Sequence, residues 1–115
     1  MLSVQTLQTI AETQGTPTYI YDLETVSAKI KHLRQVLPNA NILYAVKANP
    51  SGAILKHLAS QGVGAEVITL GELERAARAG IARDKIILSG PRQDLALIER
   101  ALELNVTHVS LDSTS

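Results

Sequence analysis

The chain has 115 residues, and its 11 Lys and Arg residues balance 11 Asp and Glu residues, so the formal net charge is zero. That length suits one domain, and the lack of cysteine excludes disulfides, thiolate metal sites and thiol redox chemistry. The balanced charge gives nucleic acid or an anionic membrane no basic patch to bind, and no run approaches the ~20 apolar residues that span a bilayer, so we expect a soluble, cytoplasmic protein.

The first predicted elements lie before residue 40. Residues 18–21 follow a proline and are rich in aromatic and β-branched side chains, a pattern that predicts a strand. Apolar side chains then recur at helical spacing over residues 26–37. This pattern predicts a helix with Asp22 as its N-cap and with Pro38 just past its end.

Four short apolar blocks follow, and their starts lie 23, 21 and 23 residues apart. Each block predicts a buried strand, and together they cover residues 42–46, 65–68, 86–88 and 109–111. Between the blocks, apolar side chains recur with the helical period, so strand and helix alternate. The predicted helices contain residues 54–59, 73–77 and 95–104.

Capping residues support these helices. Asp94 directly precedes the last predicted helix as an N-cap, and Gly80 follows the middle one as a terminator. Glu74 and Arg78 lie four residues apart on the middle helix, so we expect them to form a surface ion pair.

Short apolar strands joined by crossover helices form a parallel sheet with right-handed connections. The predicted fold class is therefore α/β. The short and regular repeats favour the N-terminal half of a (β/α)8 TIM-type barrel over a doubly wound sheet. A flavodoxin-like sandwich stays open, and it would place helices on both faces of the sheet rather than on one.

The first repeat strand ends in a charged residue. Lys47 follows the apolar run 42–46 directly, at the carboxyl end of a parallel strand, where ligands bind in such sheets. By strand parity Lys47 shares a face with Ala45, whose small side chain leaves room beside the lysine stem. Burial there would disfavour the ammonium and free the amine to attack a carbonyl and form a Schiff base. A lysine that extends from the strand end into water is the alternative.

The segment 44–49, Tyr-Ala-Val-Lys-Ala-Asn, resembles the pyridoxal-phosphate lysine motif of the alanine-racemase-like (fold type III) amino-acid decarboxylases, and most closely that of diaminopimelate decarboxylases. Residues 15–22 resemble the opening strand of this family, with its Gly-Thr-Pro and Tyr-Asp. Residues 64–73 are similar to the family's Gly-Ala-Asp-Val-Val-Ser-Gly-Gly-Glu-Leu, and residues 86–91 and 109–113 resemble its next two strand ends. The resemblance therefore runs in order through most of the chain.

The resemblance implies an enzyme whose cofactor is pyridoxal 5'-phosphate, held by Lys47 as a Schiff base, with Ala45 and Glu66 beside it. It implies a small amino-acid substrate that loses carbon dioxide, most closely meso-diaminopimelate giving L-lysine, and a homodimer. Glu66 occupies the position of a family Asp, where a carboxylate could orient Lys47 or steer proton transfer, so both residues are candidate catalytic residues.

The chain also departs from the family pattern. Glu66 is one methylene longer than the family residue, and a strand-edge glutamate that faces solvent is the alternative. Gln93 stands where the family often has Lys. Glu72 is expected to serve the helix dipole first. Three scattered histidines and no cysteine predict no metal site.

We expect residues 1–115 to form a partial pyridoxal-phosphate-binding (β/α) barrel domain. A whole barrel needs ~250 residues, and the resemblance places the rest of the barrel, a C-terminal β domain and further site residues beyond Ser115, so the isolated chain is expected to be inactive and to self-associate. An ornithine or arginine decarboxylase and a non-catalytic cofactor-binding domain stay open. An alanine racemase is disfavoured because Pro-Ser-Gly-Ala at 50–53 replaces the usual Ala-Tyr-Gly-His.

Overall fold

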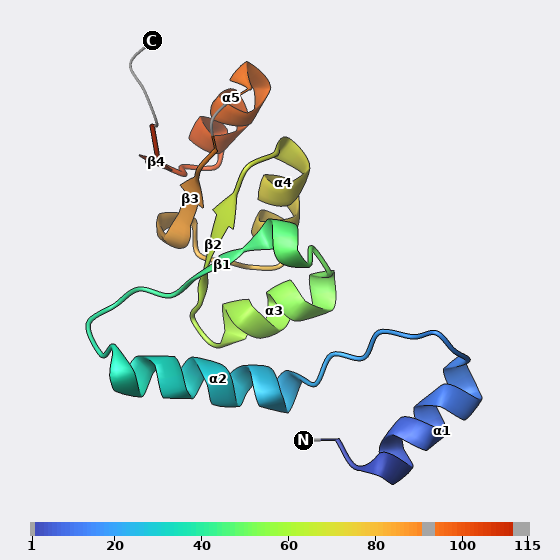
Figure 1. The fold of residues 1–115 in the computed structure, drawn as a ribbon. Helices are drawn as coiled ribbons and strands as arrows, with labels where there is room; N and C mark the ends of the chain where they lie inside the picture. Colours follow the sequence, from blue (N-terminus) through green and yellow to red (C-terminus); the bar gives the residue numbers. More distant parts are fainter. Residues whose placement is uncertain (1, 91–93, 112–115) are drawn as a thin grey trace. The chain divides into compact units, whose positions relative to one another are not determined.

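The computed structural model describes residues 2–90 and 94–111. The chain divides into two compact units, residues 1–39 and residues 40–115, which are considered separately. In the ribbon of Figure 1 the first unit is coloured blue to cyan, and the second runs from green to red.

The first unit contains two helices, α1 (Val4–Gln14) and α2 (Leu23–Val36). The predicted cap of α2 is confirmed, because the Asp22 carboxylate accepts hydrogen bonds from the backbone N–H groups of Glu24 and Thr25. Helix α1 was not predicted. It begins at Ser3, whose hydroxyl oxygen accepts from the N–H of Thr6, and no α1 residue is buried.

The strand predicted over residues 18–21 is wrong. These residues do not pair with any described strand, and Tyr19 is 92% exposed. An extended segment becomes a strand only where a neighbouring backbone satisfies its N–H and C=O groups. The aromatic and β-branched composition of the segment is therefore insufficient by itself.

The second unit alternates strands with helices, as predicted. Its strands are β1 (Leu43–Ala45), β2 (Gly64–Val67), β3 (Ile86–Leu88) and β4 (His108–Val109). Its helices are α3 (Gly52–Ser60), α4 (Leu70–Arg78) and α5 (Leu95–Glu103), with two short 3-10 turns, η1 (Val46–Ala48) and η2 (Arg83–Lys85). The predicted strands and helices of this unit are confirmed within a few residues at each end. The predicted burial of the last strand is wrong, because β4 is exposed and, among the described residues, pairs only with β3.

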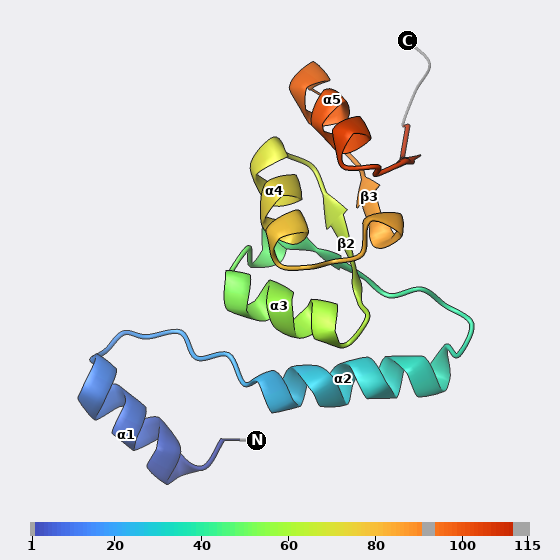
Figure 2. The same cartoon turned by 180° about the vertical axis from the view of Figure 1, so that it is seen from behind.

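The four strands form one parallel sheet in the order β1-β2-β3-β4. Helices α3, α4 and α5 all cover the same face of it, as the two opposite views in Figures 1 and 2 show. Sequential order with helices on one face is the arrangement of a (β/α) barrel. The flavodoxin-like alternative, with helices on both faces, is wrong for these strands.

Every strand pair has the same register. Paired Cα atoms of neighbouring strands lie 21 residues apart in sequence, so Ala45, Glu66, Ile87 and His108 form one row across the sheet. This row faces away from the helices, and we call that side the site face. The opposite face forms the core, because Ala65, Val67, Ile86 and Leu88 are at most 1% exposed. They pack with apolar side chains of the helices, among them Leu55, Leu73 and Leu97.

Gly64 opens β2 because no larger residue fits there. A Cβ atom at Gly64 would come well inside 3.0 Å of the Lys85 carbonyl oxygen and of a Leu43 methyl group. The N–H of Gly64 donates to the Ile42 carbonyl at 2.9 Å, which starts the β1-β2 ladder. The close approach of three backbone segments fixes the amino end of β2.

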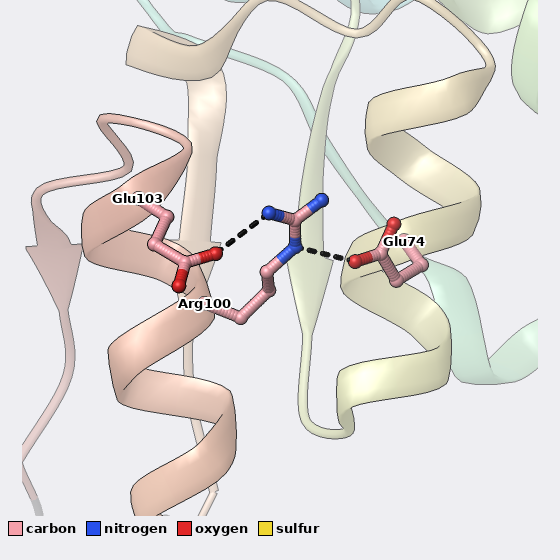
Figure 3. A network of polar contacts seen from close by, with 3 residues as sticks. All are labelled: Glu74, Arg100 and Glu103. Atoms are coloured by element: carbon pink, nitrogen blue, oxygen red, sulfur yellow. Dashed lines mark hydrogen bonds and ion pairs between the residues drawn. The ribbon is translucent and has the colours of Figure 1, made fainter.

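Helices α4 and α5 are joined by an ion-pair network (Figure 3). The Arg100 guanidinium donates to Glu74 at 2.6 Å and to Glu103 at 2.7 Å. The Glu74 carboxylate is hydrogen-bonded to Arg100 on the neighbouring helix, and the predicted partner Arg78 contributes only a smaller charge interaction, which also lowers the Glu74 pKa. The predicted N-cap Asp94 is confirmed, because its carboxylate accepts from the N–H of Ala96. In the part of the chain that the structure describes, no helix has the length and hydrophobicity needed to cross a membrane.

Candidate active site

Lys47 lies at the carboxyl edge of the sheet, but one turn past the strand. Strand β1 ends at Ala45, and Lys47 is the middle residue of the 3-10 turn η1, which contacts β2 and α4. The strand-parity argument for Lys47 is therefore wrong, because the alternation of side chains stops where the backbone coils. The placement of Lys47 at the ligand-binding end of a parallel sheet agrees with the prediction.

The turn that carries Lys47 is held by the residues around it. The Tyr44 hydroxyl donates to the Asn49 carbonyl at 3.3 Å, and the Asn49 side-chain oxygen accepts from the N–H of Ser51 at 2.9 Å. Arg75 of α4 donates to the Pro50 carbonyl at 3.4 Å. Strand β1, helix α3 and helix α4 thus each contribute one contact that fixes the path of this turn.

The Lys47 side chain is exposed, which differs from the expected buried amine. The flanking Val46 is fully buried and anchors the turn in the core instead. An exposed primary amine on a fixed turn is accessible to a dissolved aldehyde, so access does not depend on a conformational change. The described residues fix the turn that carries the Lys47 amine but leave the amine exposed to solvent.

Glu66 lies at the centre of the site face. Its Cα pairs with Ala45 on one side and with Ile87 on the other, so β2 is an inner strand. The side chain is half-buried, and its Oε1 accepts a hydrogen bond from the Ser89 hydroxyl at 2.5 Å. The alternative of a solvent-facing glutamate on an edge strand is therefore wrong.

Ala45 completes the immediate surroundings of the lysine turn. It is half-buried, lies directly opposite Glu66 and precedes Lys47 by two residues. The three residues predicted from the sequence thus come from two adjacent strands and one turn.

Glu72 has the helix-start role predicted for it. The Thr69 hydroxyl accepts from the N–H of Glu72 at 3.2 Å, and Glu72 Oε2 accepts from the N–H of Ile68 at 2.8 Å. This reciprocal arrangement satisfies two free donors at the start of α4. Glu72 therefore belongs to the helix cap rather than to the reacting groups.

The three histidines belong to three different elements. His32 is on α2, His57 is half-buried on α3, and His108 is an exposed residue of β4. Among residues 2–90 and 94–111, no three His, Cys, Asp or Glu side chains form a group that could hold a metal ion. Gln93 and the neighbouring Arg92 lie outside the described residues.

Ser89 is the site residue that the sequence analysis missed. It was quoted only as part of a strand end, although it lies two residues after Ile87 and therefore on the site face. The 21-residue register shows that Ser89 shares a face with Glu66. The hydrophobic blocks alone do not give this register, because their starts are unevenly spaced.

Comparison with known proteins agrees with this geometry. Residues 23–115 match the family model described as "Pyridoxal-dependent decarboxylase, pyridoxal binding domain". The chain belongs to this family. It is 41% identical over 108 residues to a diaminopimelate decarboxylase from Deinococcus radiodurans, a match that covers 94% of this chain and 28% of that protein.

Solved structures give the same fold. A lysine decarboxylase from Selenomonas ruminantium superposes with a TM-score of 0.88 at 31% identity, covering 98% of this chain and 31% of that one. A diaminopimelate decarboxylase from Helicobacter pylori, complexed with L-lysine, gives a TM-score of 0.84 at 31% identity, covering 93% and 28%. The fold is therefore that of the N-terminal part of a TIM-type decarboxylase barrel. The chain spans less than a third of the length of these relatives.

The residues of the site face fit the carbonyl end of pyridoxal phosphate, the cofactor of this family. An exposed primary amine at Lys47 can bond to an aldehyde carbon. The small Ala45 leaves space next to it, and the fixed Glu66 carboxylate provides a hydrogen-bond acceptor for a protonated nitrogen.

Proposed function

We propose that this chain is the lysine-bearing part of a pyridoxal-phosphate-dependent decarboxylase that converts meso-diaminopimelate to L-lysine and carbon dioxide. The observation that carries the proposal is the exposed Lys47 amine on the turn after β1, within a matched pyridoxal binding domain. The diaminopimelate decarboxylases at 33–41% identity support the choice of substrate.

In this proposal Lys47 and Glu66 have different roles. Lys47 would hold the cofactor covalently through Nζ. Glu66 lies at the centre of the site face, where its carboxylate accepts hydrogen bonds and can hold or pass a proton. When bound, the cofactor supplies the electron sink for loss of carbon dioxide, and the protein supplies orientation and proton control.

Lysine decarboxylation is the second candidate function. The crystal structure of SrLDC in complex with PLP and cadaverine has a TM-score of 0.89 at 31% identity over 99% of this chain. A protein that contains this chain should be assayed for carbon dioxide release from meso-diaminopimelate, L-lysine and L-ornithine in parallel. Faster turnover of lysine than of diaminopimelate would replace the first candidate with the second.

Cofactor attachment can be tested on this chain directly. Pyridoxal 5'-phosphate is added, the product is reduced with borohydride, and the modified peptide is identified by mass spectrometry. We expect the label on Lys47, and its loss in Lys47→Ala. Lys56, an exposed lysine of α3, serves as the matched control, so Lys56→Ala should keep the label. Equal labelling of all lysines would contradict the proposal.

We further propose a cytoplasmic homodimer, with the remaining site residues and the rest of the barrel outside residues 1–115, so that this chain alone shows negligible turnover. Support for association comes from the sheet: among the described residues, β1 and β4 each pair with one strand only, and Leu43 on the site face is 41% exposed. Unpaired strand edges and exposed apolar side chains favour contact with another chain or segment.

A further inference from the structure

The Ser89 hydroxyl and the Glu66 carboxylate form a bond between two adjacent strands on the site face. Ser89 Oγ donates to Glu66 Oε1 at 2.5 Å, and both side chains are partly buried. The backbone of Ser89 is itself anchored, because its N–H donates to the Val67 carbonyl at 3.0 Å and extends the β2-β3 ladder. The serine therefore holds the carboxylate from a rigid position.

This bond occupies only one of the two carboxylate oxygens. Among residues 2–90 and 94–111, Glu66 Oε2 has no hydrogen-bond partner. A carboxylate can accept about four hydrogen bonds, so a fixed carboxylate with one unused oxygen has capacity for a further donor. The unused oxygen lies on the face that the helices leave uncovered.

The lysine turn is the neighbouring element that carries a donor. Ala45 pairs directly with Glu66, and η1 with Lys47 begins at the next residue and contacts β2. Ser89, directly after β3, and Lys47, in the turn after β1, thus belong to the segments on either side of β2. The Glu66 carboxylate has two oxygens, so one can accept from the Ser89 hydroxyl while the other accepts from the Lys47 nitrogen.

We propose that Ser89 is a positioning residue that holds the Glu66 carboxylate ready to accept a hydrogen bond from the Lys47 nitrogen through Oε2. This inference rests on the proposed function, because the nitrogen concerned is the one that bonds to the cofactor. Without the serine hydroxyl, the Glu66 side chain must be ordered during binding, and this ordering weakens association. Ser89 acts through Glu66 and needs no contact with the cofactor.

The test is a double-mutant cycle on the binding of pyridoxal 5'-phosphate. The cofactor is titrated into each variant, and binding is measured by the absorbance of the lysine-bound cofactor. Ser89→Ala should raise the apparent Kd about fivefold, which is the factor expected for the net contribution of one ordinary hydrogen bond. In the Glu66→Ala background, the same substitution should change the apparent Kd by less than about twofold. Ser89→Thr, which keeps the hydroxyl, should restore the wild-type value.

Two controls separate positioning from folding. Ser60→Ala removes an exposed hydroxyl that donates to the His57 carbonyl within α3, and it should leave the apparent Kd unchanged. Circular dichroism of each variant checks that the sheet is intact. If Ser89→Ala and Ser89→Thr both lose the circular dichroism signal of the folded chain, the inference is overturned, because Ser89 would then be a purely structural residue.

The outcomes distinguish this inference from the function on which it rests. No label on Lys47 of the wild-type chain contradicts both. If Lys47 is labelled but Ser89→Ala has the wild-type apparent Kd, only the positioning role of Ser89 is overturned. An equal loss for Ser89→Ala in both backgrounds also overturns it, because the serine would then act independently of Glu66.

Discussion

Replacing Gly64 with alanine should destabilise the chain, because the strand start has no room for a methyl group. The added Cβ would overlap the Lys85 carbonyl oxygen, which is backbone and cannot rotate away, as well as a Leu43 methyl group. Relief requires β2 to move away from η2 and from β1. Forcing extra atoms into packed structure costs about 1–3 kcal/mol, and the backbone clash places Gly64→Ala at the upper end of that range.

The matched control is Gly71→Ala on the first turn of α4, where a Cβ meets no atom within 4 Å. Alanine is favoured over glycine in a helix by up to about 1 kcal/mol, so this variant should be as stable as the wild type or more stable. Urea unfolding followed by circular dichroism measures both. The reasoning is refuted if Gly64→Ala unfolds at the wild-type urea concentration or if Gly71→Ala is the less stable variant.

Three further predictions concern the helices and the sheet edges. The hydrogen bond from Arg100 lowers the pKa of the Glu74 carboxyl, so the network stabilises the fold at neutral pH and is lost as acid protonates Glu74. Arg100→Gln should therefore reduce the loss of unfolding free energy between neutral and acid pH, as measured by urea unfolding at a series of pH values. Thr69→Ala should cost about 1 kcal/mol of unfolding free energy through loss of the α4 cap, and Thr69→Ser should recover most of it, as thermal melts would show. Sedimentation at micromolar concentration should show self-association of the chain, and a single monomer boundary would contradict that expectation.

The regular part of the fold could be predicted because each of its elements has its own local signal. The strands are short and mainly apolar, and α2 and α5 begin at the Asp caps that the sequence predicted and the structure confirms. Helix α1 escaped prediction because none of its residues is buried, so the hydrophobic pattern in it is weak. The segment 18–21 failed for the opposite reason: its composition suits a strand, but a strand depends on a partner elsewhere.

The site could be predicted only in part, for reasons of geometry. The position of Lys47 after an apolar run placed it at the correct edge of the sheet, but the run did not show that the backbone coils after Ala45. Strand alternation therefore could not predict the exposure of Lys47, because Val46 and Lys47 lie on the same 3-10 turn, with Val46 fully buried and Lys47 exposed. The partner of Glu74 could not be read from its own helix, since Arg100 lies on the next one.

The constant register explains how residues far apart in the chain come to share one site. Each strand-helix repeat shifts the pairing by 21 residues, so Glu66 and Ile87 occupy the same level of the same face. A change of one residue in a strand's register would turn its side chains to the opposite face. Glu66 would then enter the helix-covered core, where an unpaired carboxylate is costly, and Val67 would face the site. The same alternation that packs Ala65 and Val67 under the helices therefore also keeps the carboxylate beside the lysine turn, so stability and chemistry select one register.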